Sequence, residues 1–208
     1  MGKIALVFVV LALFCDRSRG GDREIKEGDI IFQTSLSSQS EAIRLATKSE
    51  YSHAGLIFEE NGKFYVFEAV KTVRMTPLET WIKRGKNGEY AIKRLKNADD
   101  ILNAQTLSKL KETGKKFSGR DYDLAFEWSD EKIYCSELVW KIYAQGANIE
   151  IGKLQKLGDF DLSAEPVKLK LKERYGERIP LDEVVISPAA IFNSDLLDLV
   201  EVCPSDCR

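Results

Sequence analysis

The sequence contains a single histidine, His53, among 208 residues. Metal sites built from several imidazoles are therefore excluded, and any chemistry that depends on histidine must use this residue. No G-x-S-x-G pentapeptide occurs, which removes the usual nucleophile elbow of serine hydrolases. Gly152-Lys153 is followed by Leu154 and has no glycine five residues before it, so a phosphate-binding P-loop is absent as well.

The chain also lacks a large net charge, because its positive and negative residues nearly balance. Lys and Arg total 31, Asp and Glu total 33, and the formal net charge is −2. We therefore expect no nucleic-acid partner that would need a basic surface. Apolar residues make up 44% of the chain, which is typical of a folded protein, and the length suits one domain. A local cluster of basic residues is interpreted as a solvated face rather than a docking surface: Lys83, Arg84, Lys86, Lys93, Arg94 and Lys96.

The longest apolar run stands at the N-terminus. Residues 4–14 are all apolar, with Lys3 before them and the polar segment 16–20 after them. This is the layout of a secretory signal peptide, and the run is too short to span a bilayer of ~30 Å comfortably. We predict a signal peptide over residues 1–20, an exported (periplasmic or secreted) protein that meets the membrane only through that segment, and one domain over 21–208. Cys15 leaves a lipoprotein alternative open, which Phe14 disfavours because a small residue should precede a lipidated cysteine.

Besides Cys15, the chain has three cysteines: Cys135, Cys203 and Cys207. Cys203 and Cys207 fall in a polar tail, residues 201–208. In an oxidising compartment they could form a disulfide, and a frayed terminus with two free thiols is the alternative. Neither alternative gives Cys135 a disulfide partner.

Strand patterns precede helix patterns along the chain. Apolar and β-branched runs predict the following strands: residues 28–33, 53–58, 64–70, 73–76 and 90–95. Helical spacing, a capping box from Ser38 to Glu41 and Ser187-Pro188 predict the following helices: residues 42–48, 77–84, 104–117, 135–145 and a short last one from 188. Residues 147–182 are interpreted as a charged, mostly helical, peripheral excursion. This order favours an α+β domain with an antiparallel sheet and helices packed on one side of it.

Asn61-Gly62 lies between two of the predicted strands and is the strongest short signal for a hairpin. A two-residue turn there places Gly55 opposite Glu68. Because side chains alternate along a strand, His53 and Glu68 then share one face, on a diagonal of ~7–8 Å, and Gly55 leaves the space between them empty. We predict that Glu68 accepts one ring N–H of His53 and supports its protonated form.

Cys135 stands at the start of the predicted helix 135–145. The positive end of the helix dipole and a neighbouring imidazolium both lower the pKa of a thiol. A lone cysteine is more often an inert buried side chain. Together with the only histidine and its acidic partner, however, Cys135 indicates a Cys–His–carboxylate nucleophile system. Ser136 is an alternative nucleophile, which we interpret instead as a helix cap.

Five segments in chain order carry a family resemblance: GDIIFQTS, YSHAGLIFE, YVFEAV, RDYDLAFEW and YCSELVWKIY. They resemble the YaeF/YiiX-like branch of the permuted NlpC-type papain-like cysteine peptidases, from about Gly28 to Phe192. In ordinary papain-like enzymes the cysteine precedes the histidine, whereas here His53 precedes Cys135, as in the permuted group. The resemblance implies a circularly permuted papain-like (NlpC-type) α+β fold and thiol-dependent amidase or hydrolase chemistry.

By motif, the resemblance implies that Cys135 is the nucleophile, His53 the base and Glu68 the orienting acid. Tyr122 in the RDYD segment matches a tyrosine that helps to hold an oxyanion. No cofactor and no metal would be needed. The first hypothesis is an exported amidase or peptidase that cleaves peptide-like bonds, including those of cell-wall peptides. Two alternatives stay open: a lipid hydrolase or acyltransferase with an acyl substrate and the same thiol, and a non-catalytic binding protein of the same fold.

Overall fold

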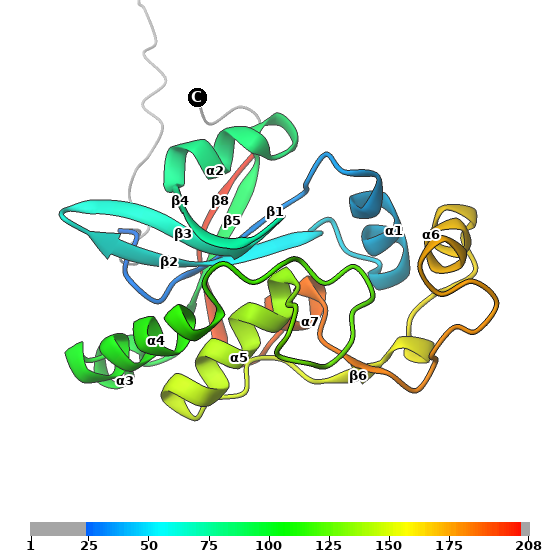
Figure 1. Cartoon of the computed structure of the whole chain (residues 1–208). Helices are drawn as coiled ribbons and strands as arrows, with labels where there is room; N and C mark the ends of the chain where they lie inside the picture. The colour runs from blue at the N-terminus through cyan, green and yellow to red at the C-terminus, as the bar shows by residue number, and fades with distance from the viewer. Residues whose placement is uncertain (1–23, 205–208) are drawn as a thin grey trace, which may run out of the picture.

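The computed structural model describes residues 24–204. The predictions for the signal peptide over residues 1–20, for Cys15 and for Cys207 therefore lie outside the described residues. Within them, six strands form one antiparallel sheet in the order β4-β3-β2-β1-β5-β8 (Figure 1). The strands are β1 (Ile30–Gln33), β2 (His53–Glu60), β3 (Lys63–Ala69), β4 (Val73–Pro77), β5 (Tyr90–Leu95) and β8 (Leu197–Cys203).

Most of the helices lie close to their predicted positions, but the helix at Ala98–Ile101 was not predicted. The helices are α1 (Ser38–Thr47), α2 (Leu78–Arg84), α3 (Ala98–Ile101), α4 (Ala104–Phe117), α5 (Cys135–Ala147), α6 (Glu165–Tyr175) and α7 (Pro188–Phe192). Two short strands, β6 (Gln155–Lys156) and β7 (Val184–Val185), pair apart from the main sheet. The predicted α+β class with an antiparallel sheet is therefore confirmed. No helix of the described residues is long and apolar enough to cross a membrane.

The sheet buries both of its faces, and the two layers differ in size. On one face, residues such as Phe32, Leu56 and Phe67 pack with Leu138 and Ile142 of α5 in the main core. Figure 1 shows α4, α5 and α7 on this side and α2 on the other. The prediction of helices on one side alone is thus wrong, because α2 covers the second face.

Trp81 explains why α2 docks there. Its side chain is fully buried in a small second core with Ile57 and Val66 of the sheet. A tryptophan buries about 150–250 Å² of surface, which is a large apolar contribution for a helix of only seven residues.

The predicted hairpin is present in the predicted register. Leu56 pairs with Phe67, and Glu60 pairs with Lys63 across a turn in which Asn61-Gly62 has positive φ at both residues. This is the backbone of a tight hairpin turn whose twist matches that of the strands. The register brings His53 and Glu68 to the same face of the sheet, as the sequence predicts.

Three sequence predictions need correction. The N-cap of α1 is Ser37 rather than Ser38, because the Ser37 side chain accepts the N–H of Ser40. Residues 147–182 hold one α-helix, α6, instead of being mostly helical. Cys203 ends strand β8, so the tail does not fray before that residue, and its pairing with Cys207 stays a prediction because Cys207 is not described.

Candidate active site

Cys135 is the first residue of α5 and is buried. The preceding Tyr134 has an extended backbone, so it turns the chain into the helix and leaves the thiol at the N-terminus. The backbone N–H groups of Ala54 and Ser136 both donate to the sulfur. Ser136 is not the cap that the sequence suggested: the N-cap is Tyr134, and the Ser136 hydroxyl donates to the carbonyl of Ile186 at 2.7 Å.

His53 begins strand β2 and forms a hydrogen bond with Cys135. Burial alone would lower the pKa of His53, but the Cys135 thiolate and the Glu68 carboxylate outweigh it and raise the pKa to about 9. Burial alone would raise the pKa of the Cys135 thiol, but the His53 imidazolium and the two N–H donors lower it below its ordinary value. The two shifts favour a thiolate–imidazolium pair near neutral pH.

Glu68 is fully buried on β3 and receives four donors. His53 Nε2 lies 2.7 Å from Oε2, which leaves Nδ1 of the ring for the thiol. Trp81 Nε1 donates to Oε2 at 2.8 Å, Thr76 Oγ1 donates to Oε1 at 2.7 Å, and the Arg84 guanidinium is also bonded to Oε2. Burial would raise the pKa of Glu68, but His53, Arg84 and Thr76 together lower it to about 2. The carboxylate is therefore ionised and fixed in orientation.

Tyr122 is also hydrogen-bonded to the thiol. Burial and the Cys135 thiolate, with which it is hydrogen-bonded, raise the pKa of Tyr122 well above its ordinary value. Its hydroxyl therefore keeps its proton. Gln39 Nε2 of α1 donates a hydrogen bond to the Tyr122 oxygen at 3.2 Å. The Tyr122 hydroxyl can therefore donate its own proton to a different acceptor. Such a donor beside a nucleophile can stabilise negative charge that develops on a carbonyl oxygen.

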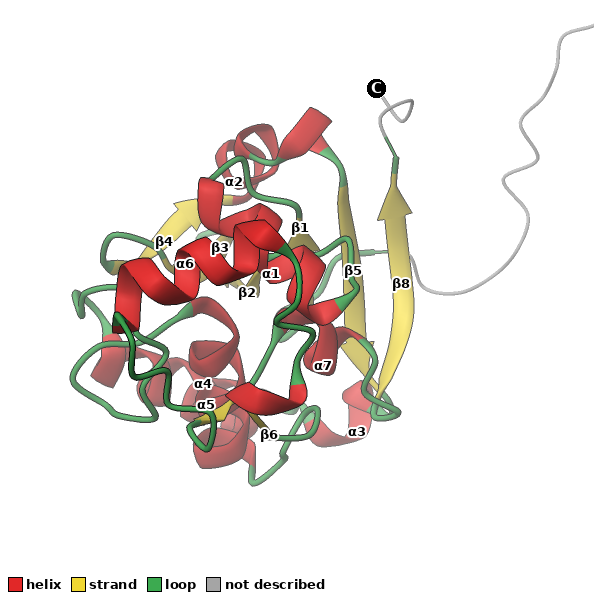
Figure 2. Ribbon diagram, turned by 90° about the vertical axis from the view of Figure 1, so that its right-hand side faces the viewer, coloured by secondary structure: helices red, strands yellow, loops and turns green. Residues whose placement is uncertain are grey.

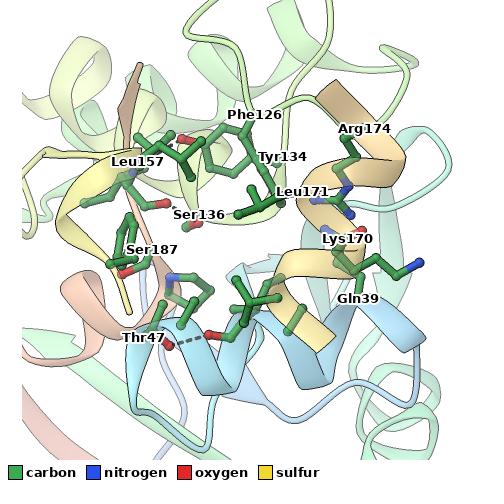
Figure 3. Close-up of a pocket in the computed structure, with 18 of the residues that line it drawn as sticks. Gln39, Thr47, Phe126, Tyr134, Ser136, Leu157, Lys170, Leu171, Arg174 and Ser187 are labelled. Atoms are coloured by element: carbon green, nitrogen blue, oxygen red, sulfur yellow. Dashed lines mark hydrogen bonds between the residues drawn. The ribbon is translucent and has the colours of Figure 1, made fainter. Parts of the chain in front are cut away.

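An apolar slot lies beside Cys135, between α1, α6 and the segments around residues 126, 157 and 186. Figure 2 shows how α1 and α6 are arranged, and Figure 3 shows the side chains that line the slot. The slot encloses about 100 Å³. Its apolar lining residues include Ile43, Phe126, Leu157, Leu162, Val167 and Leu171. The helices α1 and α6 lie side by side in Figures 1 and 2, and together they form one wall of the slot.

A second, wider opening lies beside His53 and is named here the polar cleft. Its volume is about 860 Å³, and it shares Gln39, Ile43 and Tyr122 with the apolar slot. Its polar lining residues include Ser35, Ser37, Ser52, Lys71, Arg74, Arg84, Asp121 and Lys132. The Cys135–His53 pair thus stands between two openings of opposite character.

The structure brings all four sequence-predicted site residues together: Cys135, His53, Glu68 and Tyr122. Sequence reasoning missed the residues that support them. Arg84 was assigned to a solvated basic face, but it is paired with Glu68. The spacing of Trp81 and Arg84, three residues apart, places both on one helix face and is the signal that could have identified them. Gln39 was read only as part of a helix start.

The rest of that basic cluster is not a single solvated face either. Arg94 forms a buried ion pair with Asp29, with its Nε 2.7 Å from Oδ1. Lys93 donates to the carbonyl of Phe192 and lies over the Phe192 ring. These residues hold the fold together.

Comparisons with known proteins identify the family. A family model described as a permuted papain-like amidase enzyme, YaeF/YiiX, matches residues 24–201. The chain is 49% identical over 173 residues to the uncharacterized protein YiiX of Escherichia coli (strain K12), a match that covers 83% of this chain and 84% of that protein. It also resembles the crystal structure of metalloprotein yiiX from Escherichia coli O157:H7, with a TM-score of 0.82, 48% identity, and coverage of 85% of this chain and 97% of that one.

The solved relative is described as a metalloprotein, but residues 24–204 of this chain do not fit a bound metal ion. They contain no group of three or more His, Cys, Asp or Glu side chains that could hold one.

Proposed function

Because the chain belongs to the YaeF/YiiX family of permuted papain-like amidases, we propose that it is a cysteine hydrolase that forms an acyl-enzyme on Cys135. One observation carries the proposal: the thiol, the imidazole and the fully buried carboxylate form one continuous hydrogen-bonded line. A binding protein has no need of a thiolate–imidazolium pair, so this line disfavours the non-catalytic alternative.

In the proposed reaction, the Cys135 thiolate attacks the substrate carbonyl and forms a carbon–sulfur bond. The negative charge that develops on the carbonyl oxygen is stabilised by the Tyr122 hydroxyl and by backbone N–H groups at the start of α5. The His53 imidazolium then gives its proton to the leaving nitrogen or oxygen as the carbonyl bond to it breaks. His53 next removes a proton from water, which attacks the thioester, releases the acid and restores the thiolate.

The apolar slot supports an amide or ester of an apolar acyl group as the substrate. Aliphatic side chains and Phe126 line the slot directly beside Cys135, so a hydrocarbon chain attached to the reacting carbonyl would be removed from water there. A cell-wall peptide would place polar backbone groups against the same surface without partners, which costs free energy. The slot therefore favours the acyl hydrolase over the cell-wall peptidase.

We also propose that the enzyme works outside the cytoplasm. The support is the sequence pattern of residues 1–20, a short basic start followed by eleven apolar residues and a polar end. N-terminal sequencing of the exported protein would locate the cleavage, and a full-length product retained in the cytoplasm would contradict export.

The test of the function compares amides and esters of acyl chains of two to sixteen carbons with muropeptides. We expect kcat/KM to rise with chain length until the slot is full. Cys135→Ala should lower kcat/KM by more than about 10³-fold. Mass spectrometry of quenched turnover should find the acyl group on Cys135.

Two leucines of α6 provide a matched pair for the slot. Leu171 is 8% exposed and lines the slot, whereas Leu169 is 59% exposed on the same helix. Leu171→Asn should abolish the preference for longer chains, and Leu169→Asn should preserve it. Cleavage of muropeptides with no turnover of acyl compounds would overturn the choice of substrate, and full activity of Cys135→Ala would overturn the thiol mechanism.

A further inference from the structure

The polar cleft lies on the side of the catalytic pair where a leaving group must go. The apolar slot contains Cys135, the cleft contains His53, and the two openings share Gln39, Ile43 and Tyr122. If the acyl chain lies in the slot and its carbonyl carbon lies at the Cys135 sulfur, the leaving group of the substrate extends past the His53 imidazole. His53 protonates that part of the substrate, so both groups belong on the same side.

The charge of the cleft is strongly one-sided. Four basic side chains line it against one acidic side chain, Asp121. One of the four, Arg84, is already paired with Glu68. The other three, Lys71, Arg74 and Lys132, have no ion-pair or hydrogen-bond partner among residues 24–204. The lining of the slot is mostly aliphatic or aromatic, although Lys170 and Arg174 also contribute to it.

The three cations come from separate parts of the chain. Lys71 lies in the turn between β3 and β4, and Lys132 lies just before α5. Arg74 lies on β4 directly opposite Glu68 in the register, so it shares the face of the sheet that carries His53. Three positive charges around one concave opening attract the same anion together, although each exposed charge alone contributes little.

We propose that the polar cleft binds an anionic leaving group, a carboxylate or a phosphate, so that the substrates are compounds of an apolar acyl chain joined by an amide or ester bond to a negatively charged head. This inference rests on the proposed acyl hydrolase and adds the other half of the substrate. Ser35 and Ser37, which also line the cleft, supply further hydroxyl donors for such an anion.

The test uses pairs of amides that share a dodecanoyl chain and differ only in the head. N-dodecanoylglycine is compared with N-dodecanoylglycinamide for the carboxylate, and N-dodecanoyl phosphoethanolamine with N-dodecanoylethanolamine for the phosphate. At low salt, we expect kcat/KM to be at least about tenfold higher for one or both anionic heads, and the ratio to shrink as salt screens the charges. The pair with the larger ratio identifies the source of the charge.

The variant Lys71→Gln/Arg74→Gln/Lys132→Gln should bring that ratio close to one. The matched control Lys63→Gln/Lys116→Gln/Lys153→Gln removes the same charge at exposed positions outside the cleft and should leave the ratio unchanged. Equal turnover of anionic and neutral heads by the unmodified protein would overturn the proposal. An equal loss of the ratio in the control variant would do the same, since the effect would then belong to net charge.

A binding measurement separates this proposal from the proposed function. Calorimetry with Cys135→Ala should give a dissociation constant at least about fivefold lower for the better anionic amide than for its neutral partner, which is about 1 kcal/mol. If this difference is found without turnover by the unmodified protein, the anion site stands and the hydrolase fails. If the unmodified protein turns over these amides but anionic and neutral heads give equal kcat/KM values and equal dissociation constants, the proposed hydrolase function is supported and the anion site is contradicted.

Discussion

Glu68 is held by more donors than its role as an acceptor from one imidazole requires. Trp81, Thr76 and Arg84 all bond to it besides His53, in a place from which water is excluded. A buried carboxylate without such partners would become neutral. The surplus of donors keeps Glu68 charged, and the Cys135 thiolate and the Glu68 carboxylate together raise the pKa of His53 to about 9.

Glu68→Gln should therefore change the pH profile as well as the rate. The active pair requires His53 to be protonated, so activity falls on the alkaline side as pH passes the pKa of about 9. Without the negative charge of Glu68 this pKa falls, and the alkaline limb of kcat/KM should move to lower pH. We expect kcat/KM at pH 7 to fall by about 10²-fold or more, because the amide also holds the ring less firmly.

The check is the rate of Cys135 alkylation by iodoacetamide measured against pH, together with kcat/KM. Glu60→Gln, at the exposed end of β2, is the control and should keep the native profile. An unchanged alkaline limb in Glu68→Gln would mean that the carboxylate does not govern the ionisation of His53.

Helix α2 holds the Glu68 carboxylate in place through two of its side chains. This helix of seven residues supplies both Trp81 and Arg84 to the Glu68 carboxylate. Its last turn therefore couples the docking of the helix to the charge state of Glu68. The position of α2 should accordingly affect stability in acid.

Arg84→Gln should reduce the free energy of unfolding at neutral pH and have little effect below pH 2. The pKa of Glu68 is depressed from 4.5 to about 2 in the folded protein, so its contribution to stability is present above 4.5 and is lost as the pH falls through about 2. Arg84 is one cause of that depression, so its removal raises the pKa and shrinks the contribution. We expect a loss of about 1–2 kcal/mol at pH 7, discounted because Arg84 is partly exposed.

Urea unfolding at several pH values between 2 and 7 measures this difference. Lys83→Gln changes the neighbouring residue of the same helix, whose side chain is 72% exposed, and should cost less than about 0.5 kcal/mol. A loss of the same size at every pH in Arg84→Gln would contradict the assigned role of its charge.

Most elements were predictable because local signals agreed with the tertiary structure. The local turn sequence Asn61-Gly62 determines the hairpin register, and this register places His53 and Glu68 on one face of the sheet without any long-range contact. The missed strand β8 has a physical reason. Its pairing with β5 skips Val200, so the alternation of apolar and polar residues changes phase in the middle of the strand. A period-2 search does not recognise such a segment.

The supporting residues of the site were harder to predict because they depend on long-range packing. The sequence places Arg84 among other basic residues, and only the docking of α2 on the sheet brings it to Glu68. The apolar slot is similar, since its walls come from α1 and from residues beyond 157 that were read as a peripheral excursion. The four predicted site residues carry a strong sequence signal, whereas their surroundings depend on how distant elements pack together.

At the scale of the whole molecule, β8 returns the chain to the sheet. It pairs with β5 at the edge, and its first residue, Leu197, is 5% exposed in the main core, whereas Leu199 is 57% exposed. Leu197→Ala should lower the free energy of unfolding by about 2–5 kcal/mol. Leu199→Ala in the same strand should change it by less than about 0.5 kcal/mol. Chemical denaturation gives both values, and equal losses would mean that β8 is not anchored through Leu197.

Strand β2 supplies both the His53 imidazolium and the Ala54 N–H that lower the pKa of the Cys135 thiol. This strand is synthesised long before Cys135, so the full pKa shift requires the strand and α5 to be folded together. In a chain that is still unfolded during synthesis or transit, the thiol has an ordinary pKa. It therefore reacts slowly and is protected from premature reaction. The appearance of a fast-reacting sulfur thus marks the moment at which the two halves of the molecule have met.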